Sequence, residues 1–353
     1  MLKDKVAFIG LGACGSNIAL LFQKKNYNAL FINGSEQDNK ALAGARNILK
    51  LKGFDGCGGD RQKAEEALAS NLDIIEEIKK IKEPIIYLVF STAGSTGSGL
   101  APIICEVISE LYENEGFSKT ICCIAVLPKR NEALQKHINA YNCIKELSEK
   151  ENIGSCILVD NNKLESLSKI NTTLVSTLDL FFTEDSYSAK GNVDMSERMK
   201  MIEQKGGFLL SAVCNGKAKG IELLESLFQK NIFAPIEPDA VVEYTAVINS
   251  LDDGIDIDAV IKAVGIPQNI FQGYGAKKTI TILSGLSFPI TYLTEIKENA
   301  EEQYKSRLES RSGGRMLQEL NLDEPKKQME SKKEPKPKMS RLDMLRKLKD
   351  NKR

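Results

Sequence analysis

The chain has 353 residues, of which 42% are hydrophobic and 27% are charged, and its formal net charge at pH 7 is zero. This composition is typical of a soluble globular protein, and the length favours two domains, each with its own core. No apolar run approaches the roughly 18 residues of a membrane-spanning helix, and the first residues lack the apolar stretch of a signal peptide. We therefore expect a cytoplasmic protein without a transmembrane helix.

The zero net charge hides an asymmetry between the body and the C-terminus. Residues 326–353 contain twelve Lys or Arg and four Asp or Glu, a net charge of +8, so residues 1–325 carry −8. An acidic body argues against nucleic acid as the main ligand of the globular part. A basic tail suits an acidic partner, a phosphate backbone or a membrane surface.

The cysteines and the single histidine give no sign of a metal site. His137 lies in a polar helical stretch, where we expect a solvated side chain, and one histidine leaves little room for a catalytic triad. The cysteines lack metal-ligand spacing, and we expect reduced thiols that pack as small hydrophobic side chains. They stand at positions 14, 57, 105, 122, 123, 143, 156 and 214.

In residues 1–163, β-rich apolar runs alternate with amphipathic helical patterns. Such alternation is typical of βαβ units and predicts an α/β domain of Rossmann-like type with a buried parallel sheet. Residues 164–190 follow as a central linking helix, whose helical pattern is continuous to residue 183. The strands are predicted at Val6–Gly10, Ala29–Asn33, Ile85–Ser91, Ile121–Leu127 and Ser155–Val159.

The alternating strand and helix patterns of residues 191–288 predict a smaller C-terminal α/β domain. One helix is expected after the polar break at 184–192, and the further elements are strands at 207–213, 241–249 and 279–285 and helices at 218–229 and 256–264.

A C-terminal helix at 289–312 and a flexible basic tail at 313–353 complete the chain. The tail is rich in Lys, Glu and Pro and has too few apolar residues to fold alone. Near its end, Met339, Leu342, Leu345 and Leu348 recur every three residues. This weak amphipathic pattern suits either a helix that orders on a partner or a solvated extension.

A glycine-rich turn follows the first strand. Gly10, Gly12 and Gly15 form a G-x-G-x-x-G pattern between that strand and an apolar helix. Glycines permit a tight turn and close backbone approach, and the helix N-terminus offers N–H groups to a phosphate. Alone, this pattern indicates a dinucleotide oxidoreductase at least as strongly as any other protein, and Glu36 would suit a ribose hydroxyl.

A second turn, Ser91–Gly99, follows the strand at 85–90 and precedes a helix predicted at Leu100–Tyr112. Its glycines and hydroxyl side chains suit a polyphosphate, with a helix dipole behind them. One Rossmann pyrophosphate does not need two such turns, which weighs against the oxidoreductase. A third glycine cluster, Gly53–Arg61, suits a terminal phosphate or a plain surface loop, and no Walker-type G-x-x-x-x-G-K-[ST] occurs.

The turn Ser91–Gly99 resembles the G-G-G-T-G-[ST]-G signature of the tubulin/FtsZ superfamily, with Ser91-Thr-Ala at its usually more glycine-rich start and the core kept at residues 96–99. The other landmarks follow the order of that family over about residues 3–300. The resemblance implies a GTPase that binds GTP or GDP with Mg²⁺, forms a head-to-tail filament with copies of itself and is activated by that polymerisation.

The resemblance also implies which residues contact the nucleotide. Glu132 is similar to the ribose-binding acid, and Asn161 and Asn171 resemble the two residues that read the guanine edge. No Mg²⁺ ligands are assigned. The full set of nucleotide contacts is Gly10, Gly12, Ala13, Cys14, Gly15, Asn17, Gly58, Gly59, Arg61, Ala93, Gly94, Ser95, Thr96, Gly97, Ser98, Gly99, Glu132, Asn161 and Asn171.

Three polar residues after the central helix are the catalytic candidates. From the residues alone, Asp194 and Glu197 predict a capping box at the start of the next helix, with both carboxylates on one face. Asn192 precedes them in an N-x-D-x-x-[DE] pattern. In the family this loop enters the nucleotide pocket of the neighbouring subunit, which implies that the three residues act there on the attacking water.

Within the superfamily the chain resembles the TubZ branch, which plasmids and some bacteriophages encode and which moves DNA. This implies an adaptor of the TubR type that binds the C-terminal tail and centromere-like DNA. The alternatives are an FtsZ-like cell-division GTPase, a GTP-binding regulator that does not polymerise and, more distantly, an NAD(P)-dependent oxidoreductase.

Overall fold

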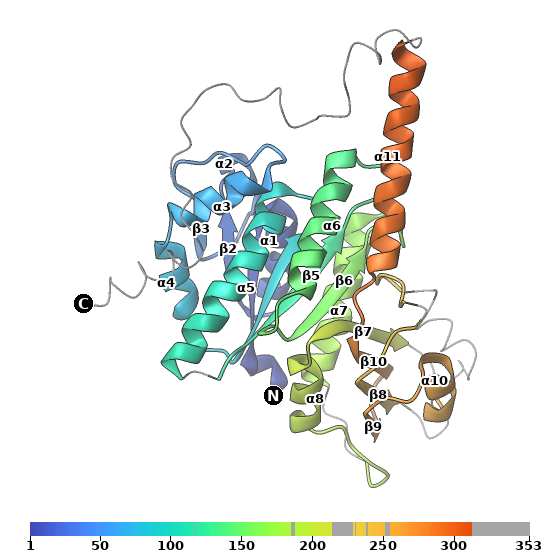
Figure 1. Ribbon diagram of the computed structural model, residues 1–353. Coiled ribbons are helices and arrows are strands. Elements are labelled where there is room, and N and C mark those ends of the chain that lie inside the picture. Colours follow the sequence, from blue (N-terminus) through green and yellow to red (C-terminus); the bar gives the residue numbers. More distant parts are fainter. Residues whose placement is uncertain are drawn as a thin grey trace.

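The computed structural model describes residues 1–116, 118–184, 188–213, 229, 231–237, 239–250 and 255–312. They form a mixed α/β fold around one ten-stranded sheet with the strand order β3-β2-β1-β4-β5-β6-β7-β10-β8-β9 (Figure 1). Within these residues, no helix is long and apolar enough to cross a membrane. Cys214, the tail at 313–353 and nearly all of the helix predicted at 218–229 lie outside them.

Seven strands pair in parallel and form the larger part of the sheet. All positions of β1 and β6 are buried, as expected of a parallel sheet that is covered on both faces. The strands are β1 (Val6–Leu11), β2 (Asn28–Asn33), β3 (Ile48–Lys50), β4 (Ile85–Ser91), β5 (Thr120–Leu127), β6 (Ser155–Asp160) and β7 (Gly206–Val213).

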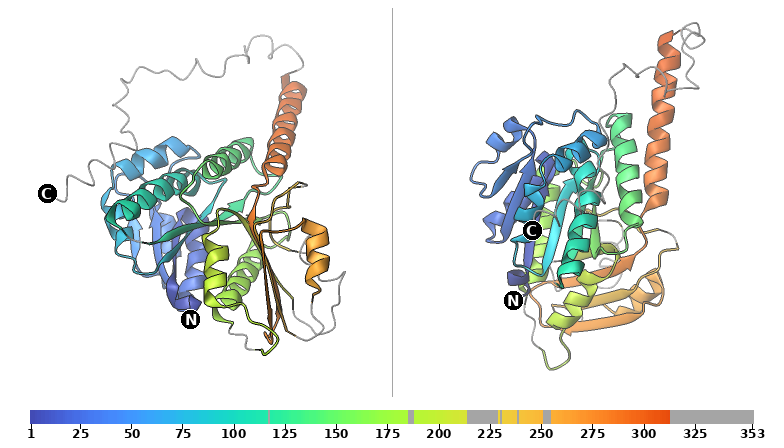
Figure 2. Two further views of the ribbon diagram at one scale, coloured as in Figure 1. Left: turned by 60° about the horizontal axis from the view of Figure 1, so that its bottom comes forward. Right: turned by 60° about the vertical axis from the view of Figure 1, so that its left-hand side comes forward.

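Helices cover both faces of the parallel strands (Figure 2). On one face, α1 (Gly12–Lys24) and α7 (Leu167–Thr183) pack over an aromatic cluster in which the Phe8 and Phe22 rings stack 3.7 Å apart. The opposite face carries α3 (Arg61–Ala69), α4 (Asp73–Lys79), α5 (Ser95–Glu115) and α6 (Leu134–Ser148). The short helices η1 (Leu2–Lys5) and α2 (Glu36–Ala41) precede β1 and follow β2.

The C-terminal strands continue the same sheet. β10 (Thr279–Leu286) lies antiparallel to β7 and to β8 (Tyr244–Asn249), and β9 (Asn269–Tyr274) lies parallel to β8 at the edge. Two helices, α8 (Met195–Glu203) and α10 (Ile257–Val264), share a hydrophobic core with these strands. The last helix, α11 (Ile290–Ser312), packs along α6, and its far end projects beyond the body (Figure 1).

Most predicted strands are confirmed to within one or two residues, but three features differ from the predictions. β3 and β9 were not predicted, because β3 has only three residues and both strands carry exposed positions. The central helix runs from Leu167 to Thr183, so it begins three residues after the predicted start at 164 and ends at residue 183, where its helical pattern ends. The expected solvation of His137 is wrong: its side chain is 2% exposed beneath the segment that precedes α6.

Candidate functional site

A cavity of about 450 Å³ opens at the carboxyl ends of β1, β2 and β4. The strand order reverses between β1 and β4, and ligands of open parallel sheets bind beside such a point. We refer to this cavity as the cleft. It is lined by Leu11, Gly12, Ala13, Cys14, Asn33, Ser35, Asp38, Asp55, Gly56, Cys57, Gly58, Ser91, Ala93, Gly94, Ser95, Thr96, Gly97, Glu132 and Lys136.

The first glycine turn brings the N-terminus of α1 to the cleft. Gly12 begins the helix with a φ of 68°, which favours glycine, and Gly12, Ala13 and Cys14 line the cleft. Gly15 lies behind them, where a Cβ atom would stand 1.9 Å from the Val89 carbonyl oxygen. Gly15 therefore allows α1 to approach β4, and the N–H groups of the first turn of α1 meet the cleft.

Two other predicted residues of this turn do not line the cleft. A Cβ atom on Gly10 would stand 2.7 Å from the Cα atom of Ser16, so Gly10 also serves close packing. The side chain of Asn17 is exposed on α1, outside the set of residues that line the cleft.

The second turn is shorter than predicted, because α5 begins at Ser95 and not at Leu100. Glycine has a low helix propensity, which favoured a loop in the sequence, but close packing overrides it here. A Cβ atom on Gly97 would stand 2.8 Å from the Cβ atom of Phe90, and one on Gly99 would stand 2.6 Å from the Arg61 carbonyl oxygen. The start of α5 therefore lies directly on β4 and α3.

This packing places a second helix N-terminus at the cleft. Ala93, the N-cap Gly94 and residues 95–97 line it, whereas Ser98 turns its hydroxyl back to the Gly94 carbonyl oxygen at 2.5 Å. Two helix N-termini that face one cavity create a positive electrostatic field, which suits an anion with several phosphate groups.

The third glycine cluster is held against the start of α5. The Gly59 N–H donates to the Ser95 hydroxyl at 3.2 Å, and the buried Asn139 amide donates to the carbonyl oxygens of Gly59 and Ala93 at 3.1 and 3.2 Å. Gly58 lines the cleft and Gly59 does not. Asn139 was missed in the sequence, since nothing local distinguishes a polar residue in the middle of α6.

Arg61 belongs to the packing behind the cleft. Its guanidinium group donates to the Ser98 carbonyl oxygen at 2.8 Å and forms an ion pair with Glu146 at 2.9 Å. It thereby joins α3, α5 and α6, and its side chain does not line the cleft.

Glu132 completes the wall of the cleft from the segment between β5 and α6. Its carboxylate accepts hydrogen bonds from the Lys129 N–H at 3.0 Å and from Lys136 Nζ at 2.6 Å. Burial raises the pKa of Glu132, but these two hydrogen bonds, together with the charges of Lys136 and His137, outweigh burial and hold the pKa below its usual value. Lys136 was missed in the sequence, although it stands one helical turn after Glu132.

Further polar side chains of the cleft were not among the predicted site residues. Asn33 ends β2, and its amide donates to Asp38 at 3.1 Å, while the Asp55 carboxylate accepts from the Glu36 N–H at 3.2 Å. The signals in the sequence were the position of Asn33 at the carboxyl end of a buried strand and the position of Asp55 within the third glycine cluster. In the described residues, no group of three or more His, Cys, Asp or Glu side chains is arranged to hold a metal ion.

Asn161 and Asn171, predicted to read a guanine base, are half-buried and lie outside the lining of the cleft. Asn161 follows β6, and Asn171 lies in the first half of α7. Next to Asn161, the buried Asp160 binds both Asn162 and Tyr292.

Asn192, Asp194 and Glu197 lie at the start of α8, at the opposite end of the body from α2 and α3 (Figure 1). The predicted capping box is confirmed, since the Glu197 N–H donates to Asp194 and the Asp194 N–H donates to Glu197, both at 2.9 Å. Asn192 accepts from the Ser188 N–H at 2.8 Å. We refer to residues 191–197 as the acidic loop, and it does not meet the cleft of its own chain.

Arg198 anchors the acidic loop. Its side chain is 5% exposed and donates to the carbonyl oxygens of Phe181, in the last turn of α7, and of Val193, at 2.7 and 3.3 Å. The loop is therefore fixed between α7 and α8, although Asp194 itself is exposed.

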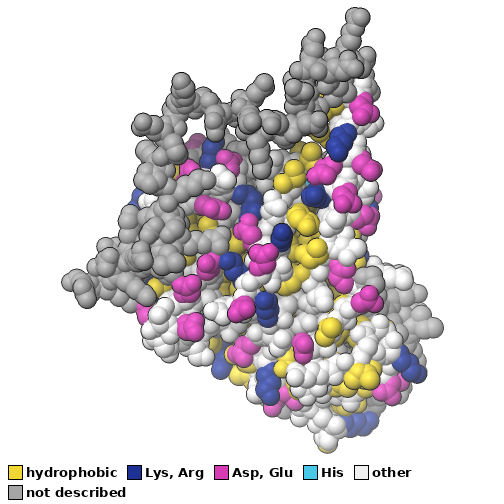
Figure 3. Space-filling model, in the orientation of Figure 1, with side chains coloured by type: hydrophobic (Ala, Val, Ile, Leu, Met, Phe, Trp, Pro, Cys, Tyr) yellow, Lys and Arg dark blue, Asp and Glu magenta, His cyan; other side chains and the backbone are white. Residues whose placement is uncertain are grey.

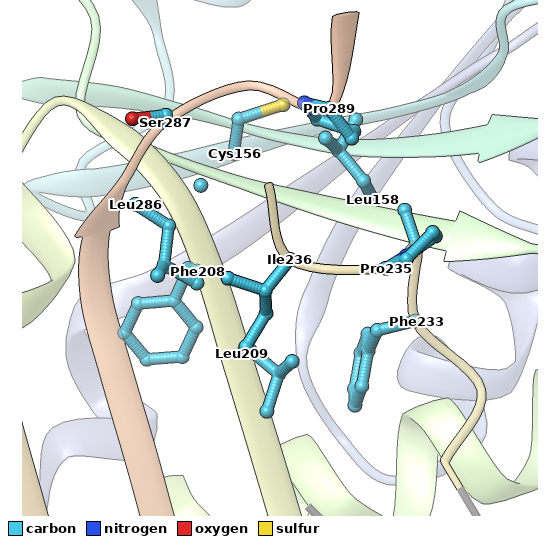
Figure 4. A pocket seen from close by; sticks show the side chains of 12 residues that line it. Cys156, Leu158, Phe208, Leu209, Phe233, Pro235, Ile236, Leu286, Ser287 and Pro289 are labelled. Atoms are coloured by element: carbon cyan, nitrogen blue, oxygen red, sulfur yellow. The ribbon is translucent and has the colours of Figure 1, made fainter. Parts of the chain in front are cut away.

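A second cavity lies between β6, β7, β10 and residues 233–236 (Figure 4). It measures about 30 Å³, and Leu158, Phe208 and Phe233 contribute apolar surface to it. This is room for about one water molecule in largely apolar surroundings, so it is a gap in the packing and not a ligand site.

Comparisons with known proteins agree with this geometry. The model of the Tubulin/FtsZ family GTPase domain matches residues 5–169. The chain is 31% identical to the tubulin-like protein TubZ of Clostridium botulinum C phage over 333 residues, 92% of this chain and 91% of that protein.

Solved structures extend the likeness to three dimensions. The tail-truncated TubZ of Clostridium botulinum phage c-st superposes with a TM-score of 0.76 at 30% identity, over 87% of this chain and 100% of that one. A GTPγS-form protofilament of TubZ from Bacillus thuringiensis serovar israelensis has a TM-score of 0.71 at 15% identity, over 88% and 95% of the two chains, and shares the fold. The chain therefore belongs to the tubulin/FtsZ family and contains its GTPase domain.

Proposed function

We propose that this protein binds GTP in the cleft, assembles head to tail into filaments and hydrolyses GTP where successive copies meet. The observation that carries the proposal is the separation of the two candidate sites. Helix α2, whose Asp38 lines the cleft, and helix α8, which begins in the acidic loop, lie at opposite ends of one body (Figure 1). One copy cannot bring them together. In a head-to-tail stack, the acidic loop of one copy meets the cleft of the next.

The cleft accounts for the nucleotide. The N–H groups at the starts of α1 and α5, with the hydroxyls of Ser95 and Thr96, bind the phosphates. Glu132 accepts from the ribose hydroxyls, and the guanine base extends beyond the lining of the cleft to Asn161 and Asn171, which read its edge.

Mg²⁺ fits the same cleft. It prefers oxygen ligands and commonly binds through one or two carboxylates together with substrate phosphates, and Asp38 and Asp55 supply carboxylates there. When bound, the ion neutralises charge on the phosphates.

The acidic loop supplies the hydrolytic groups. In the capping box, Asp194 Oδ1 and Glu197 Oε2 accept backbone N–H groups, and the second oxygen of each carboxylate can accept a hydrogen bond from a water molecule. With Asn192, they orient that water for attack on the γ-phosphorus atom of the neighbouring copy's nucleotide, and the bond to the β–γ bridging oxygen breaks.

The proposal assigns a task to each part of the chain. Residues 1–163 bind GTP with the help of Asn171. Residues 164–190 link this domain to the activating residues 191–288, and 289–312 form the C-terminal helix. Support for assembly comes from the Bacillus thuringiensis TubZ, which shares the fold and whose solved structure is a protofilament.

The further task is segregation of plasmid or phage DNA. The basic tail, residues 313–353, binds an adaptor of the TubR type that sits on centromere-like DNA, and its net positive charge over 326–353 suits an acidic surface on the adaptor. Deletion of 313–353 should abolish co-sedimentation of the adaptor–DNA complex with the filaments. Unchanged co-sedimentation would exclude the tail as the adaptor site.

The experiment that tests the central proposal compares the wild type with Glu197→Gln in sedimentation and phosphate-release assays with GTP and Mg²⁺. Glutamine keeps the capping box, so α8 stays intact while the carboxylate is lost. We expect both proteins to pellet and phosphate release by Glu197→Gln to fall by about 100-fold. A wild type that neither binds GTP nor pellets would refute the proposal and would favour the alternative of an NAD(P)-dependent oxidoreductase.

A further inference from the structure

We propose that Tyr292 is a positioning residue that links the first turn of α11 to the two loops that hold the nucleoside, so that nucleotide binding and the state of α11 influence each other. The inference rests on the proposed function, because it concerns the regulation of the same site. Three parts of the molecule carry the inference: a buried carboxylate, the two loops that its hydrogen-bond network joins, and the helix that projects from the body.

The buried carboxylate is Asp160, which ends β6 and is 1% exposed. Its Oδ2 atom accepts a hydrogen bond from the Tyr292 hydroxyl at 2.8 Å. Its Oδ1 atom accepts from the backbone N–H and the side-chain amide of Asn162, at 2.9 and 2.7 Å. A buried carboxylate needs such donors, because water is not there to replace them.

Tyr292 donates this hydrogen bond at neutral pH. Burial, with the charge of Asp160 beside it, raises the pKa of Tyr292 to about 12, so the hydroxyl keeps its proton. α11 therefore contributes one of the three donors that stabilise Asp160.

Asn162 extends the network to the loop that carries Glu132. Its side-chain amide donates to the Pro128 carbonyl oxygen at 3.0 Å, and its side-chain oxygen accepts from the Arg130 N–H at 2.8 Å. The Lys129 N–H in turn donates to the Glu132 carboxylate. One network thus fixes residues 128–132 and 160–162, the segments that the proposed function assigns to ribose and base.

A second set of contacts joins the same loop to α11. The Arg130 guanidinium group lies 5.5 Å from the centre of the Tyr292 ring and forms an ion pair with Glu295 at 3.5 Å. This pair is exposed and adds little energy by itself. The buried hydrogen bond from Tyr292 is the stronger link, and the Arg130 contacts orient the ring that carries it.

Glu132 also faces the seam between α6 and α11. It lines both the cleft and a groove of about 540 Å³ to which Leu134, Ile138 and Tyr304 contribute apolar surface. Apolar side chains are visible along this seam in Figure 3. Hence α11 adjoins the nucleoside segments through the Tyr292 hydrogen bond and through the groove that Glu132 helps to line.

Because α11 is long, a contact made far from the nucleotide can act through this link. Its 23 residues span about 34 Å at 1.5 Å per residue, and the far end projects beyond the body (Figure 1). A contact that shifts the projecting part acts on Asp160 through the first turn. Because linkage is reciprocal, a bound nucleotide must stabilise the first turn of α11 by the same factor by which that turn strengthens nucleotide binding.

The test is Tyr292→Phe in the full chain, which removes one hydroxyl and keeps the ring under Arg130. We expect GTP and GDP to bind about tenfold more weakly, and the preference for GTP over ITP, which lacks the exocyclic amino group, to fall. The matched control is Tyr141→Phe. The Nζ atom of Lys297 on α11 lies 5.1 Å from the centre of the Tyr141 ring, but Tyr141 is outside the hydrogen-bond network around Asp160. Nucleotide binding by this variant should be unchanged.

Hydrogen exchange provides the reciprocal measurement. In the wild type, GDP should slow amide exchange over residues 290–296, and in Tyr292→Phe this protection should be largely lost. A variant with wild-type nucleotide affinity and wild-type protection would overturn the inference. The inference would also be overturned if Tyr292→Phe lowered the Tm but left nucleotide affinity and the preference for GTP over ITP unchanged. A wild type that binds no guanine nucleotide would instead refute the proposed function itself.

Discussion

The cleft and the acidic loop differ in how their polar groups are held. In the cleft, the backbone at the starts of α1 and α5 is fixed by glycines packed against β4, and Glu132 is held by the Lys129 N–H and Lys136. In the acidic loop, Asp194 is exposed and its carboxylate is engaged only with the start of α8 among the contacts described.

This difference teaches how the two regions divide the proposed work. Phosphate groups need many preorganised donors, which a rigid sheet edge supplies. Carboxylates that must enter another copy have to stand at the surface, with only their backbone anchored, as Arg198 anchors Val193. Substitutions in the cleft should therefore mainly lower the stability of the fold, whereas substitutions in the acidic loop should mainly lower the rate of GTP hydrolysis.

The largest effect on stability is expected from Gly15→Ala in the cleft. The new Cβ atom would stand 1.9 Å from the Val89 carbonyl oxygen, so α1 has to move away from β4. We expect a loss of unfolding free energy of about 3 kcal/mol and the loss of nucleotide binding. Gly94→Ala is the control for chemical denaturation: its φ is −75° and a Cβ atom there has its nearest neighbour at 4.0 Å, so only the difference between glycine and alanine as N-cap remains, about 0.5 kcal/mol. Equal destabilisation by both would contradict the packing argument.

Asp194→Asn should separate capping from chemistry in the acidic loop. Asparagine is as good an N-cap as aspartate, so the unfolding free energy should change by less than about 0.5 kcal/mol. Phosphate release should still fall by about 100-fold, because the carboxylate is gone. Asp194→Ala, by contrast, should also cost about 1 kcal/mol of stability. Normal phosphate release by Asp194→Asn would assign Asp194 a capping role alone.

Arg198→Met tests the anchor of the acidic loop. It removes the donors to the carbonyl oxygens of Phe181 and Val193, which should lower the unfolding free energy by about 2 kcal/mol. Phosphate release should fall while GTP affinity of the subunit stays the same, since the cleft is at the other end. The exposed Lys200→Met on the same helix is the control, and a loss of GTP affinity in Arg198→Met would show that the two regions are not independent.

The smallest effect concerns His137 beside the cleft. Its Nε2 atom lies 3.2 Å from the Glu132 carbonyl oxygen, its Nδ1 atom is buried without a partner, and burial lowers the pKa of His137 from 6.5. Because the unfolded chain binds the proton more readily, stability should fall as the pH drops through 6.5, by at most about 1.4 kcal/mol per pH unit. Thermal unfolding between pH 7.5 and 5.5 would measure this, and His137→Gln should show a smaller slope. Equal slopes would assign the pH dependence to other groups.

Several features were predictable because their causes lie within a few residues. A strand that runs into Gly10–Gly15 or Ser91–Gly97 and then into a helix is set by local backbone preferences. The capping box of Asp194 and Glu197 is likewise complete within four residues. For these features the sequence was sufficient.

Other features depend on segments that are distant in the chain. The helical start of α5 at Ser95 requires Phe90 and Arg61 to lie against Gly97 and Gly99, which outweighs the low helix propensity of glycine. Lys136 reaches the cleft, and His137 is buried, only because the segment before α6 folds back at Glu132.

By itself, the sequence determined the alternating α/β pattern, the glycine turns at strand ends and the family signature, since each is written in short-range periodicity or in a contiguous motif. The tertiary structure alone decided that the cleft and the acidic loop stand at opposite ends of the body, and that Tyr292 of α11 reaches Asp160, 132 residues earlier. The reason is physical: local preferences fix turns and helices, but which side chains meet is decided by the packing of the whole sheet and its helices.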